Sequence, residues 1–578
     1  MRKKEAKFIV CLLLLSLGCA LGACSVRPRP ARTEDGEALF RLGFSGTPDS
    51  LNPYAAGNEE SAAVLSLLYD TLFSVDPVTG EYEGSLCREW TVTDGAARGG
   101  KLWRLTLQEG VAWHDGQPLT ASDVEFSLQS AKDFSNLYSY PELALLDTTG
   151  IAVEDDTHLA FLVWGDVPYM EELLSRVPIL PRHIWNQTEG MDYNSSGIPS
   201  NYPLARETLY AVPADRGTMI GSGLYIWDGM ENNVVTLRRN ESYWGGSARG
   251  AVVELHFGCD DTAELYRSKK LDACWDLSEE GFEALRAQGR GVFTEGTEGE
   301  LYSLSFFLGD SGTPLASENV RRAIDYCLDR SAVLTCFGGG MPSIGYLTPY
   351  SPWYYEDAIE ERRDFSPDSA AWLLESAGYR DSDGDGVREA GAGRTLSFDL
   401  LCSDAVPAWA EAAETLRAAC ASAGIKIRVR ALPPEELYAA VGKGDYDLLL
   451  SAQRCYNDPF YSFGTFYWNG GDNAFSASGL YGRVVSPGWN YTGYQNEGYD
   501  ALYRDMLVLT GQERRDVIEE MGGFLYDAAI SLPIGFSVDR QICSPAWFNA
   551  RAYRGTGLYF APEILRQQLL GISAAGRK

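Results

Sequence analysis

Four histidines are the side chains in this 578-residue chain best suited to general-base catalysis or zinc binding near neutral pH. They are scattered, without the His-Glu-x-x-His spacing of a helical zinc site. The sequence also lacks the Gly-x-Ser-x-Gly motif of serine hydrolases and the phosphate-binding loop Gly-x-x-x-x-Gly-Lys-Ser/Thr. We therefore expect that the protein is not an enzyme and has no cofactor. The histidines are His114, His158, His183 and His256.

One acidic run has the spacing of a metal-binding loop. Residues 381–389 read Asp-Ser-Asp-Gly-Asp-Gly-Val-Arg-Glu, which matches a calcium loop at positions one, three, five, six and nine. Position twelve, where such a loop places a bidentate glutamate, is Ala392. The alternative is a solvated turn, because Asp and Gly are both common in tight turns. The sequence leaves calcium binding open, and we assign no metal site.

Nine of the twelve cysteines follow residue 24, and none of these forms a Cys-x-x-Cys pair. Neither a structural zinc site nor a dithiol redox motif is therefore indicated. An odd number of thiols cannot all pair, and the sequence does not decide whether any disulfide forms. Cys327 and Cys420 lie on the apolar faces of expected helices, where we interpret them as small buried hydrophobic residues.

The first 37 residues carry export signals. Basic residues precede an apolar run at 8–17, which is shorter than the roughly 18 residues of a membrane-spanning helix, so we expect a cleaved signal peptide over residues 1–23. Leu21-Gly22-Ala23-Cys24 resembles the bacterial lipoprotein box, which implies that the thiol of Cys24 is lipidated. The alternative is an ordinary secretory signal with an incidental cysteine. Residues 24–37 are expected to form a solvated tether.

Length and charge limit the possible partners. A chain of 578 residues with 45% hydrophobic content is too long for one ordinary core and indicates two or three domains. Its formal charge of −31 repels nucleic acid and anionic lipid and favours solubility. The charge also mildly favours cationic ligands. We expect a globular monomer with no nucleic-acid partner.

Residues 102–128 show the order strand, turn, helix. Residues 103–107 alternate apolar and polar side chains, and Asp115-Gly116 is a turn signal. Thr120 and Asp123 have the spacing of a reciprocal helix N-cap. Two later segments carry helix signals of their own. Residues 366–378 begin with an N-cap and a proline and end in glycine, and residues 319–330 have one apolar face at helical spacing.

The run 102–128 resembles the signature of the extracytoplasmic solute-binding proteins of family 5, the oligopeptide-, dipeptide- and nickel-binding type of bacterial ABC importers. Further matching segments cover almost the whole mature chain. The resemblance implies an α/β fold of the large three-domain type, with two lobes that close on a ligand as a flytrap does. It also implies a role in import without catalysis. The further segments are residues 50–53, 69–72, 220–225, 237–244 and 319–330.

The same resemblance implies a division into three domains. A discontinuous domain I would comprise residues 38–68, 200–300 and 540–578. Domain II would comprise residues 69–199, and domain III residues 301–539. A chain that passes repeatedly between lobes can bend at the crossings while each lobe stays rigid.

Residues 445–459 resemble the ligand strand of the family. In peptide binders its main chain pairs with an extended ligand, and an aspartate four residues before a proline holds the ligand's ammonium group. Cys455 occupies that position here. Because a buried ammonium without a partner is costly, either Glu59, aligned with a cleft-facing loop, or Asp458 substitutes, or the ligand has no free amino terminus there. Asp458 before Pro459 also fits a helix N-cap.

Aromatic residues crowd the segment 456–494. Some are expected on loops that face the cleft, where they would suit apolar side chains, sugars or planar chelates; the alternative is that most fill the core of domain III. Arg454 could bind a ligand carboxylate or form a surface ion pair. The expected ligand-binding residues are Asn58, Glu59, Tyr138, Tyr140, Ser451, Gln453, Arg454, Cys455, Tyr456, Asp458, Trp468 and Tyr491.

A peptide is the expected ligand, and ABC permease subunits are the expected partners. An oligosaccharide or a metal chelate such as a nickel complex is an alternative within the family, although the scarcity of histidine argues against direct nickel ligation. An alternative from another class is a signalling or chaperone-like surface lipoprotein that performs no transport. The expected location is extracytoplasmic, attached by lipid to the outer face of the cytoplasmic membrane or in the periplasm.

Overall fold

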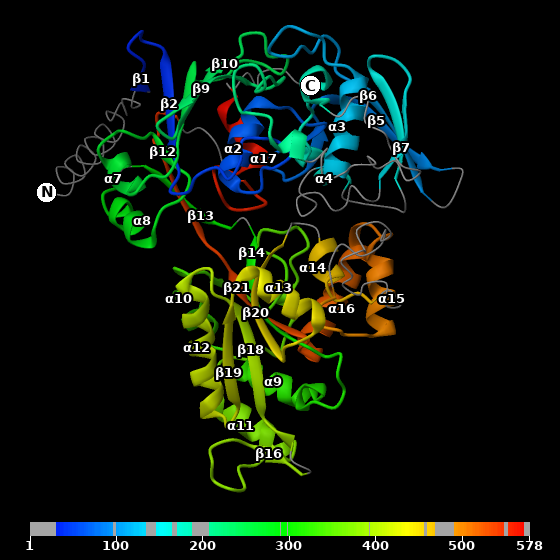
Figure 1. The fold of residues 1–578 in the computed structure, drawn as a ribbon, viewed down its shortest axis with the longest axis vertical. Helices are drawn as coiled ribbons and strands as arrows, with labels where there is room; N and C mark the ends of the chain where they lie inside the picture. Colours follow the sequence, from blue (N-terminus) through cyan, green and yellow to red (C-terminus); the bar gives the residue numbers. More distant parts are fainter. Residues whose placement is uncertain are drawn as a thin grey trace, which may run out of the picture.

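The computed structural model has two lobes (Figure 1), and the chain passes between them. No helix among the residues it describes is long and apolar enough to span a bilayer. The described residues are 31–95, 100–134, 146–163, 170–187, 207–289, 291–297, 299–391, 394–455, 459–468, 490–547 and 553–570.

The upper lobe in Figure 1 contains an eight-stranded sheet that gathers strands from the beginning, the middle and the end of the chain. Its strands are β1 (Ala31–Arg32), β2 (Ala38–Gly43), β9 (Tyr225–Glu231), β10 (Val234–Arg239), β11 (Val252–His256), β12 (Ala273–Cys274), β13 (Val292–Gly296) and β22 (Asp539–Cys543). Their order is β13-β22-β12-β2-β11-β10-β9, with β1 paired to β2. Strands β11 and β12 lie on either side of β2 and run parallel to it, so β2 is at the centre of the sheet although it lies near the start of the chain.

The pairing of β1 with β2 corrects the expected tether. Ala31 lies opposite Leu39, and a turn over residues 33–36 connects the two strands. The backbone amide of Thr33 donates to the carbonyl of Glu37 across this turn, at 3.0 Å. A tether that extends to residue 37 is therefore wrong, because residues 31–37 already form an antiparallel hairpin at the edge of the lobe.

Four helices belong to this part of the upper lobe. They are α2 (Glu59–Leu68), α7 (Thr262–Arg267), α8 (Glu279–Arg286) and α17 (Pro562–Leu569). Helices α2 and α17 pack against each other, although they come from opposite ends of the chain. Pro562 takes the first helical position of α17, where a missing N–H costs no hydrogen bond.

The upper lobe also contains a four-stranded sheet of order β5-β6-β8-β7 and a small two-stranded sheet. The elements are β3 (Phe73–Val75), β4 (Tyr82–Gly84), β5 (Cys87–Asp94), β6 (Lys101–Leu107), β7 (Leu146–Val153), β8 (His158–Val163), α3 (Ala121–Phe134), α4 (Met170–Arg176) and α5 (Arg182–Trp185). The predicted order strand, turn, helix is confirmed by β6, a left-handed Gly116 and α3. The Asp123 carboxylate accepts from the Thr120 amide at 2.9 Å, which is one half of the reciprocal cap. The other half is absent, because the Thr120 hydroxyl donates to the same carboxylate instead of accepting from the Asp123 amide.

The lower lobe is built on a six-stranded sheet of order β15-β21-β14-β20-β18-β19. Its strands are β14 (Glu300–Phe306), β15 (Met341–Pro342), β18 (Ser397–Ser403), β19 (Lys426–Leu432), β20 (Leu448–Arg454) and β21 (Ser531–Phe536), and a hairpin of β16 (Glu389–Ala390) and β17 (Arg394–Thr395) lies apart. The helical segments are η2 (Pro314–Ala316), α9 (Glu318–Tyr326), α10 (Arg330–Cys336), η3 (Glu356–Ala358), α11 (Pro367–Ser376), α12 (Pro407–Ser422), α13 (Pro434–Lys443), α14 (Phe460–Gly464), α15 (Glu497–Met506) and α16 (Gly511–Ala528).

The helix signals of the lower lobe are confirmed in one segment and corrected in the other. In α11, Ser366 accepts from the amide of Ser369 at 3.2 Å, and the left-handed Gly378 follows the helix end, as predicted. The expected continuous helix over 319–330 is wrong. Helix α9 ends at Tyr326, because Asp329 caps a new helix, α10. The apolar face itself is buried as expected.

Three of the segments that carry the family resemblance, residues 69–72, 220–225 and 237–244, converge on one carboxylate. Asp70 is fully buried and accepts from Ser222 Oγ at 3.1 Å, Tyr243 Oη at 2.9 Å and Trp244 Nε1 at 2.9 Å. The guanidinium of Arg566 on α17 donates to the same carboxylate. These residues therefore tie the end of α2 to the middle and the end of the chain, which is a structural role.

The chain crosses between the lobes twice within the residues described. Strand β13 of the upper sheet is followed along the chain by β14 of the lower sheet, with Thr297 and Gly299 between them, and β21 returns through residues 537–538 into β22 (Figure 1). The amide of Ser537 donates to the carbonyl of Glu300 at 2.9 Å. The two crossing segments therefore lie side by side, which is the arrangement of a hinge.

Candidate ligand-binding cleft

A cavity of about 330 Å³ lies where the two lobes face each other. The upper lobe contributes one side of α2 along its length, the first turn of α17 and the end of α4, and the lower lobe contributes Arg454 at the end of β20. A second cavity of about 40 Å³ shares four lining residues with the first and reaches the crossing segment at Gly299. We call the two cavities together the interlobe cleft.

Asn58 and Glu59 line the larger cavity. They do so from a helix, so the expectation that Glu59 lies on a loop is wrong. Asn58 is the N-cap of α2: its Oδ1 accepts from the Ser61 amide at 3.0 Å, and its Nδ2 donates to the carbonyl of Thr47 at 2.8 Å. The cap satisfies one of the free amides at the helix start and fixes Glu59 in the first turn, where the helix dipole favours a carboxylate.

Glu59 contacts the opposite lobe. Its Oε1 lies 3.9 Å from Nη1 of Arg454, and its Oε2 accepts from Nε1 of Trp275 at 3.4 Å. Burial raises the pKa of Glu59, the Arg454 guanidinium and Trp275 oppose this increase, and the carboxylates of Glu563 and Glu300 add to it. Because 41% of the Arg454 side chain is exposed, this ion pair contributes little stability by itself.

Strand β20, the predicted ligand strand, ends at the cleft. Its first half is buried and its second half is partly exposed. Strand β14 pairs with it along its whole length, whereas β18 pairs only with Leu448 and Leu449. On the β18 side, the edge that includes Ser451, Gln453 and Arg454 has no paired strand among the described residues. Such an edge can accept the main chain of an extended peptide.

Cys455 follows this edge and lines the smaller cavity. It is buried, and burial raises the pKa of its thiol to about 11. Its backbone amide donates to the carbonyl of Gly299 at 2.7 Å, and Nε2 of Gln453 lies 3.9 Å from its sulfur. A neutral thiol held in this way cannot replace the carboxylate that the family resemblance places at this position.

Four expected ligand residues of the described part of the chain line neither cavity. The hydroxyl of Tyr491 is hydrogen-bonded to Oγ of Ser305 at 3.2 Å, and the backbone amide of Trp468 donates to Asp500 at 2.9 Å. Ser451 and Gln453 also lie outside the cavity walls, on β20. The expected residues outside the described part of the chain are Cys24, Tyr138, Tyr140, Tyr456 and Asp458.

The aromatic residues of α14 and the turn after it fill the core of the lower lobe. Phe463 is fully buried, and its carbonyl accepts from the hydroxyl of Tyr499 at 2.8 Å. The carbonyl of Phe460 accepts from the hydroxyl of Tyr503 at 3.0 Å. For these residues the alternative of a core role is confirmed. The buried aromatic residues of this segment are Phe460, Phe463, Phe466 and Tyr467.

The histidines and the acidic run lie outside the cleft. His114 makes structural contacts: its Nδ1 accepts from the amide of Gly221, and its Nε2 lies 3.1 Å from the carbonyl of Gly223. Burial lowers its pKa, which favours a neutral ring. Carboxylate oxygens of the three aspartates in 381–385 lie within 4.8 Å of one another on an exposed turn beside β16, at the far end of the lower lobe (Figure 1). Within this turn Asp381 accepts from the backbone amides of Gly384 and Gly386.

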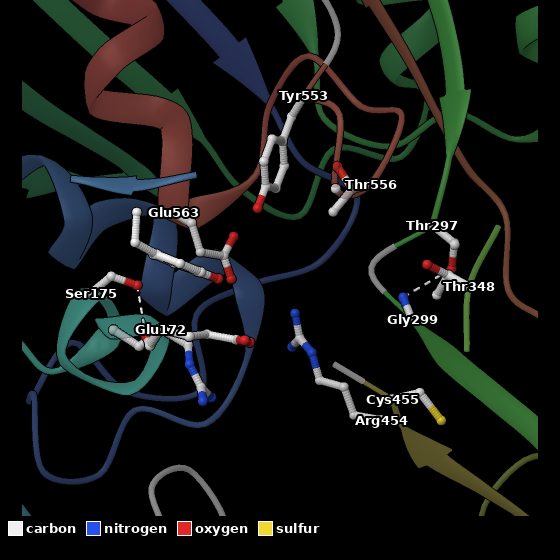
Figure 2. Close-up of a pocket in the computed structure, with 13 residues that line it drawn as sticks. Glu172, Ser175, Thr297, Gly299, Thr348, Arg454, Cys455, Tyr553, Thr556 and Glu563 are labelled. Atoms are coloured by element: carbon white, nitrogen blue, oxygen red, sulfur yellow. Dashed lines mark hydrogen bonds between the residues drawn. The ribbon is translucent and has the colours of Figure 1, made fainter. Parts of the chain in front are cut away.

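Sequence reasoning missed a charged cluster on the upper wall. Glu172 and Arg176 come from α4 and Glu563 from α17, and all three line the smaller cavity. Figure 2 shows Glu172, Glu563 and Arg454 pointing toward the same space. The only sequence signal was an acidic residue in the first turn of each helix, and such residues usually face solvent.

Comparisons with known proteins agree with this geometry. A family model for "Bacterial extracellular solute-binding proteins, family 5 Middle" matches residues 81–474. The oligopeptide-binding protein AppA of Bacillus subtilis is 22% identical over 89% of this chain and 90% of its own length. The oligopeptide-binding protein OppA of the same organism is 22% identical, and the match spans 60% of this chain and 64% of OppA.

Solved structures show the same fold. A periplasmic oligopeptide-binding protein from Thermotoga maritima superposes with a TM-score of 0.70 at 18% identity, over 92% of this chain and 98% of that one. NikZ from Campylobacter jejuni in complex with Ni(L-His) superposes with a TM-score of 0.65 at 16% identity, over 92% and 99% of the two chains. With a two-lobe fold, a cleft between the lobes and a family match over most of its length, this chain belongs to family 5 of the bacterial extracellular solute-binding proteins.

Proposed function

We propose that this protein is the substrate-binding component of an ABC importer and that it binds peptides in the interlobe cleft. The observation that carries the proposal is the free edge of β20 beside the cavity, from Ser451 to Arg454. An extended peptide pairs with such an edge through its main chain, whatever its side chains are. The names of AppA and OppA as oligopeptide-binding proteins support the same ligand class.

Binding is coupled to closure of the lobes. A ligand on β20 that also contacts α2 and α17 touches both lobes, so it stabilises the closed state by its differential affinity. The two connections between the sheets, from β13 to β14 and from β21 to β22, supply the hinge. The closed form then presents a single surface to the permease subunits.

The three-domain division follows from this proposal. Domain I comprises residues 38–68, 200–300 and 540–578, domain II residues 69–199 and domain III residues 301–539. It is supported by the sheets, because the described strands of each proposed domain pair only with strands of that domain or with β1. The N-terminal boundary moves to residue 31, where β1 joins the sheet.

We also propose a lipid anchor. Residues 1–23 are removed as a signal peptide, and Cys24 carries a diacylglyceryl group that holds the monomeric protein at the outer face of the membrane. The support is the sequence Leu-Gly-Ala-Cys at 21–24. The residues between Cys24 and β1 are then the tether.

A metal chelate is a second candidate ligand within the same role. The arginines Arg176 and Arg454 line the cleft and suit a chelate that carries carboxylates. The likeness to NikZ, solved with Ni(L-His), favours this alternative. None of the four histidines lines either cavity, so the metal would arrive with its own ligands.

Native mass spectrometry of the purified protein tests the proposal. We expect a bound species that dissociates as one or more peptides, and calorimetric binding of synthetic peptides of matching length. A sugar or a chelate as the bound species, with no binding of any peptide, would contradict the peptide assignment.

A further inference from the structure

The charged residues of the cleft do not balance. Among the described residues, five charged side chains line the two cavities: the carboxylates of Glu59, Glu172 and Glu563 and the guanidiniums of Arg176 and Arg454. When all five are ionised, these described side chains carry one more negative than positive charge. An excess charge in a partly buried site is costly unless a counter-charge joins it, so the cleft is prepared for a cation.

Glu563 holds the excess charge most directly. Its Oε2 is buried and has no hydrogen-bond partner among the described residues. The carboxylate points into the space that Figure 2 shows between the lobes. By contrast, Glu59 already contacts Arg454 and Trp275. A buried carboxylate oxygen without a donor is expensive, which favours a ligand that supplies the donor.

Glu172 and Glu563 face a common neighbour. Burial raises the pKa of Tyr82 well above its usual range. The nearby Glu172, Tyr553 and Glu563 raise this pKa further, and the Arg176 guanidinium opposes the increase. The two carboxylates and both tyrosines line the smaller cavity. Carboxylates combined with tyrosine rings are a surrounding that favours an organic cation.

The size of this cavity limits the group that fits. A buried water needs about 10–15 Å³, so a volume of about 40 Å³ accepts a small head group such as an ammonium or the tip of a guanidinium. The smaller cavity opens toward the larger one, with which it shares Arg454 and Glu563. A head group can thus enter while the remainder of the ligand lies beside β20.

We propose that Glu563 and Glu172, with the rings of Tyr82 and Tyr553, form a subsite for one monovalent organic cation of the ligand. This inference rests on the proposed function and adds the charge that the peptide must carry. In the family resemblance the cation is held by a residue at the position of Cys455, which carries no charge here. In our proposal the cation is held instead by the cavity wall that α4 and α17 form. The cation is either the amino terminus of the peptide or a lysine or arginine side chain.

Calorimetry with three pentapeptides on the unmutated protein tests the subsite. The peptides, all with an amidated carboxyl terminus, are penta-alanine with a free amino terminus, N-acetyl penta-alanine, and N-acetyl Ala-Ala-Lys-Ala-Ala. We expect the neutral acetylated peptide to bind at least tenfold more weakly than a cationic one. Recovery of affinity by the free amino terminus alone assigns the subsite to that group, and recovery by the lysine assigns it to a side chain. Equal binding of all three peptides overturns the inference but leaves the proposed function intact.

Three variants locate the cation. Glu563→Gln and Glu172→Gln should each weaken the cationic peptide at least tenfold and change the neutral peptide less than twofold. Glu60→Gln is the matched control, because Glu60 lies on α2 next to the site but lines neither cavity. Melting curves show whether each variant is folded, and the peptide comparison above remains decisive if one is not. Loss of cationic preference in Glu60→Gln but in neither site variant overturns the inference. Failure of every peptide to bind the unmutated protein refutes the proposed function and the inference together.

Discussion

The backbone amide of Cys455 donates a 2.7 Å hydrogen bond to the carbonyl oxygen of Gly299. This bond joins the end of β20 to one of the two segments that cross between the lobes. Gly299 has a φ of +89°, and a Cβ at this position would lie 2.2 Å from the carbonyl oxygen of Cys455. The strand and the hinge therefore approach each other so closely that only glycine fits.

Gly299→Ala should destabilise the protein by about 1–3 kcal/mol, because alanine at a left-handed φ is strained and its methyl group meets the backbone of Cys455. Urea unfolding followed by circular dichroism measures the change. Gly523→Ala is the control: it lies inside α16 with no atom near the added Cβ, and we expect a gain of about 0.5–1 kcal/mol. Equal effects of the two substitutions would contradict the close approach.

Saturating ligand should reduce the radius of gyration measured by small-angle X-ray scattering, because the lobes close about the crossing segments. The melting temperature should rise in the same samples by mass action. The copurified species, removed by partial unfolding and then added back, serves as the ligand. A higher melting temperature without compaction would argue against hinge closure.

Cys24→Ala should move the protein from the detergent-soluble membrane fraction to the medium or the periplasm. Its unfolding curve should not change, because residue 24 precedes the first strand of the fold. Fractionation followed by immunoblotting measures the distribution. Unaltered association with the membrane fraction would refute the lipid anchor.

Ionisation of Glu59 should lower stability as the pH increases. Burial raises its pKa above the usual 4.5, so the folded state holds the proton over a range in which the unfolded state has released it. The contribution of Glu59 to the free energy of unfolding is therefore highest below pH 4.5 and falls as the pH rises through the raised pKa. Urea unfolding at several pH values should show Glu59→Gln gaining stability relative to the unmutated protein from pH 4.5 upward. A relative loss over that range would contradict the raised pKa.

Glu59 was also a candidate from sequence for the residue that holds the ammonium. The structure gives it two partners already, Arg454 and Trp275, so we expect Glu59→Gln to weaken cationic peptides less than Glu563→Gln does. The same calorimetric titrations rank the two variants.

Asp70→Asn should destabilise the fold by about 3–5 kcal/mol, because the buried guanidinium of Arg566 would lose its counter-charge. Chemical denaturation measures the loss. Asp381→Asn, on an exposed turn, is the control and should change stability by less than about 0.5 kcal/mol. A small effect of Asp70→Asn would mean that its hydrogen bonds, rather than its charge, join the segments.

The sequence alone determined helices and strands whose ends are set by residues close to them in the chain. Ser366 and Gly378 bound α11 as expected, and the alternation over 103–107 gives β6. Residues 102–128 and the further matching segments carried the resemblance to the family, and the sequence itself shows a cysteine, Cys455, where the family has a carboxylate. The continuous helix over 319–330 was wrong because Asp329 accepts from the amide of Ala332 and starts a second helix.

Only the tertiary structure decided which charged residues meet. Glu59, Glu172 and Glu563 each lie in the first turn of a helix, where a carboxylate is common and is usually exposed. The packing of α2 against α17 turns Glu59 and Glu563 toward the cleft. Contacts between distant segments set this arrangement. The spacing of these residues in the sequence does not predict it, because they come from segments that are far apart in the chain. The sequence therefore determined that a cleft exists, and the fold decided its charge.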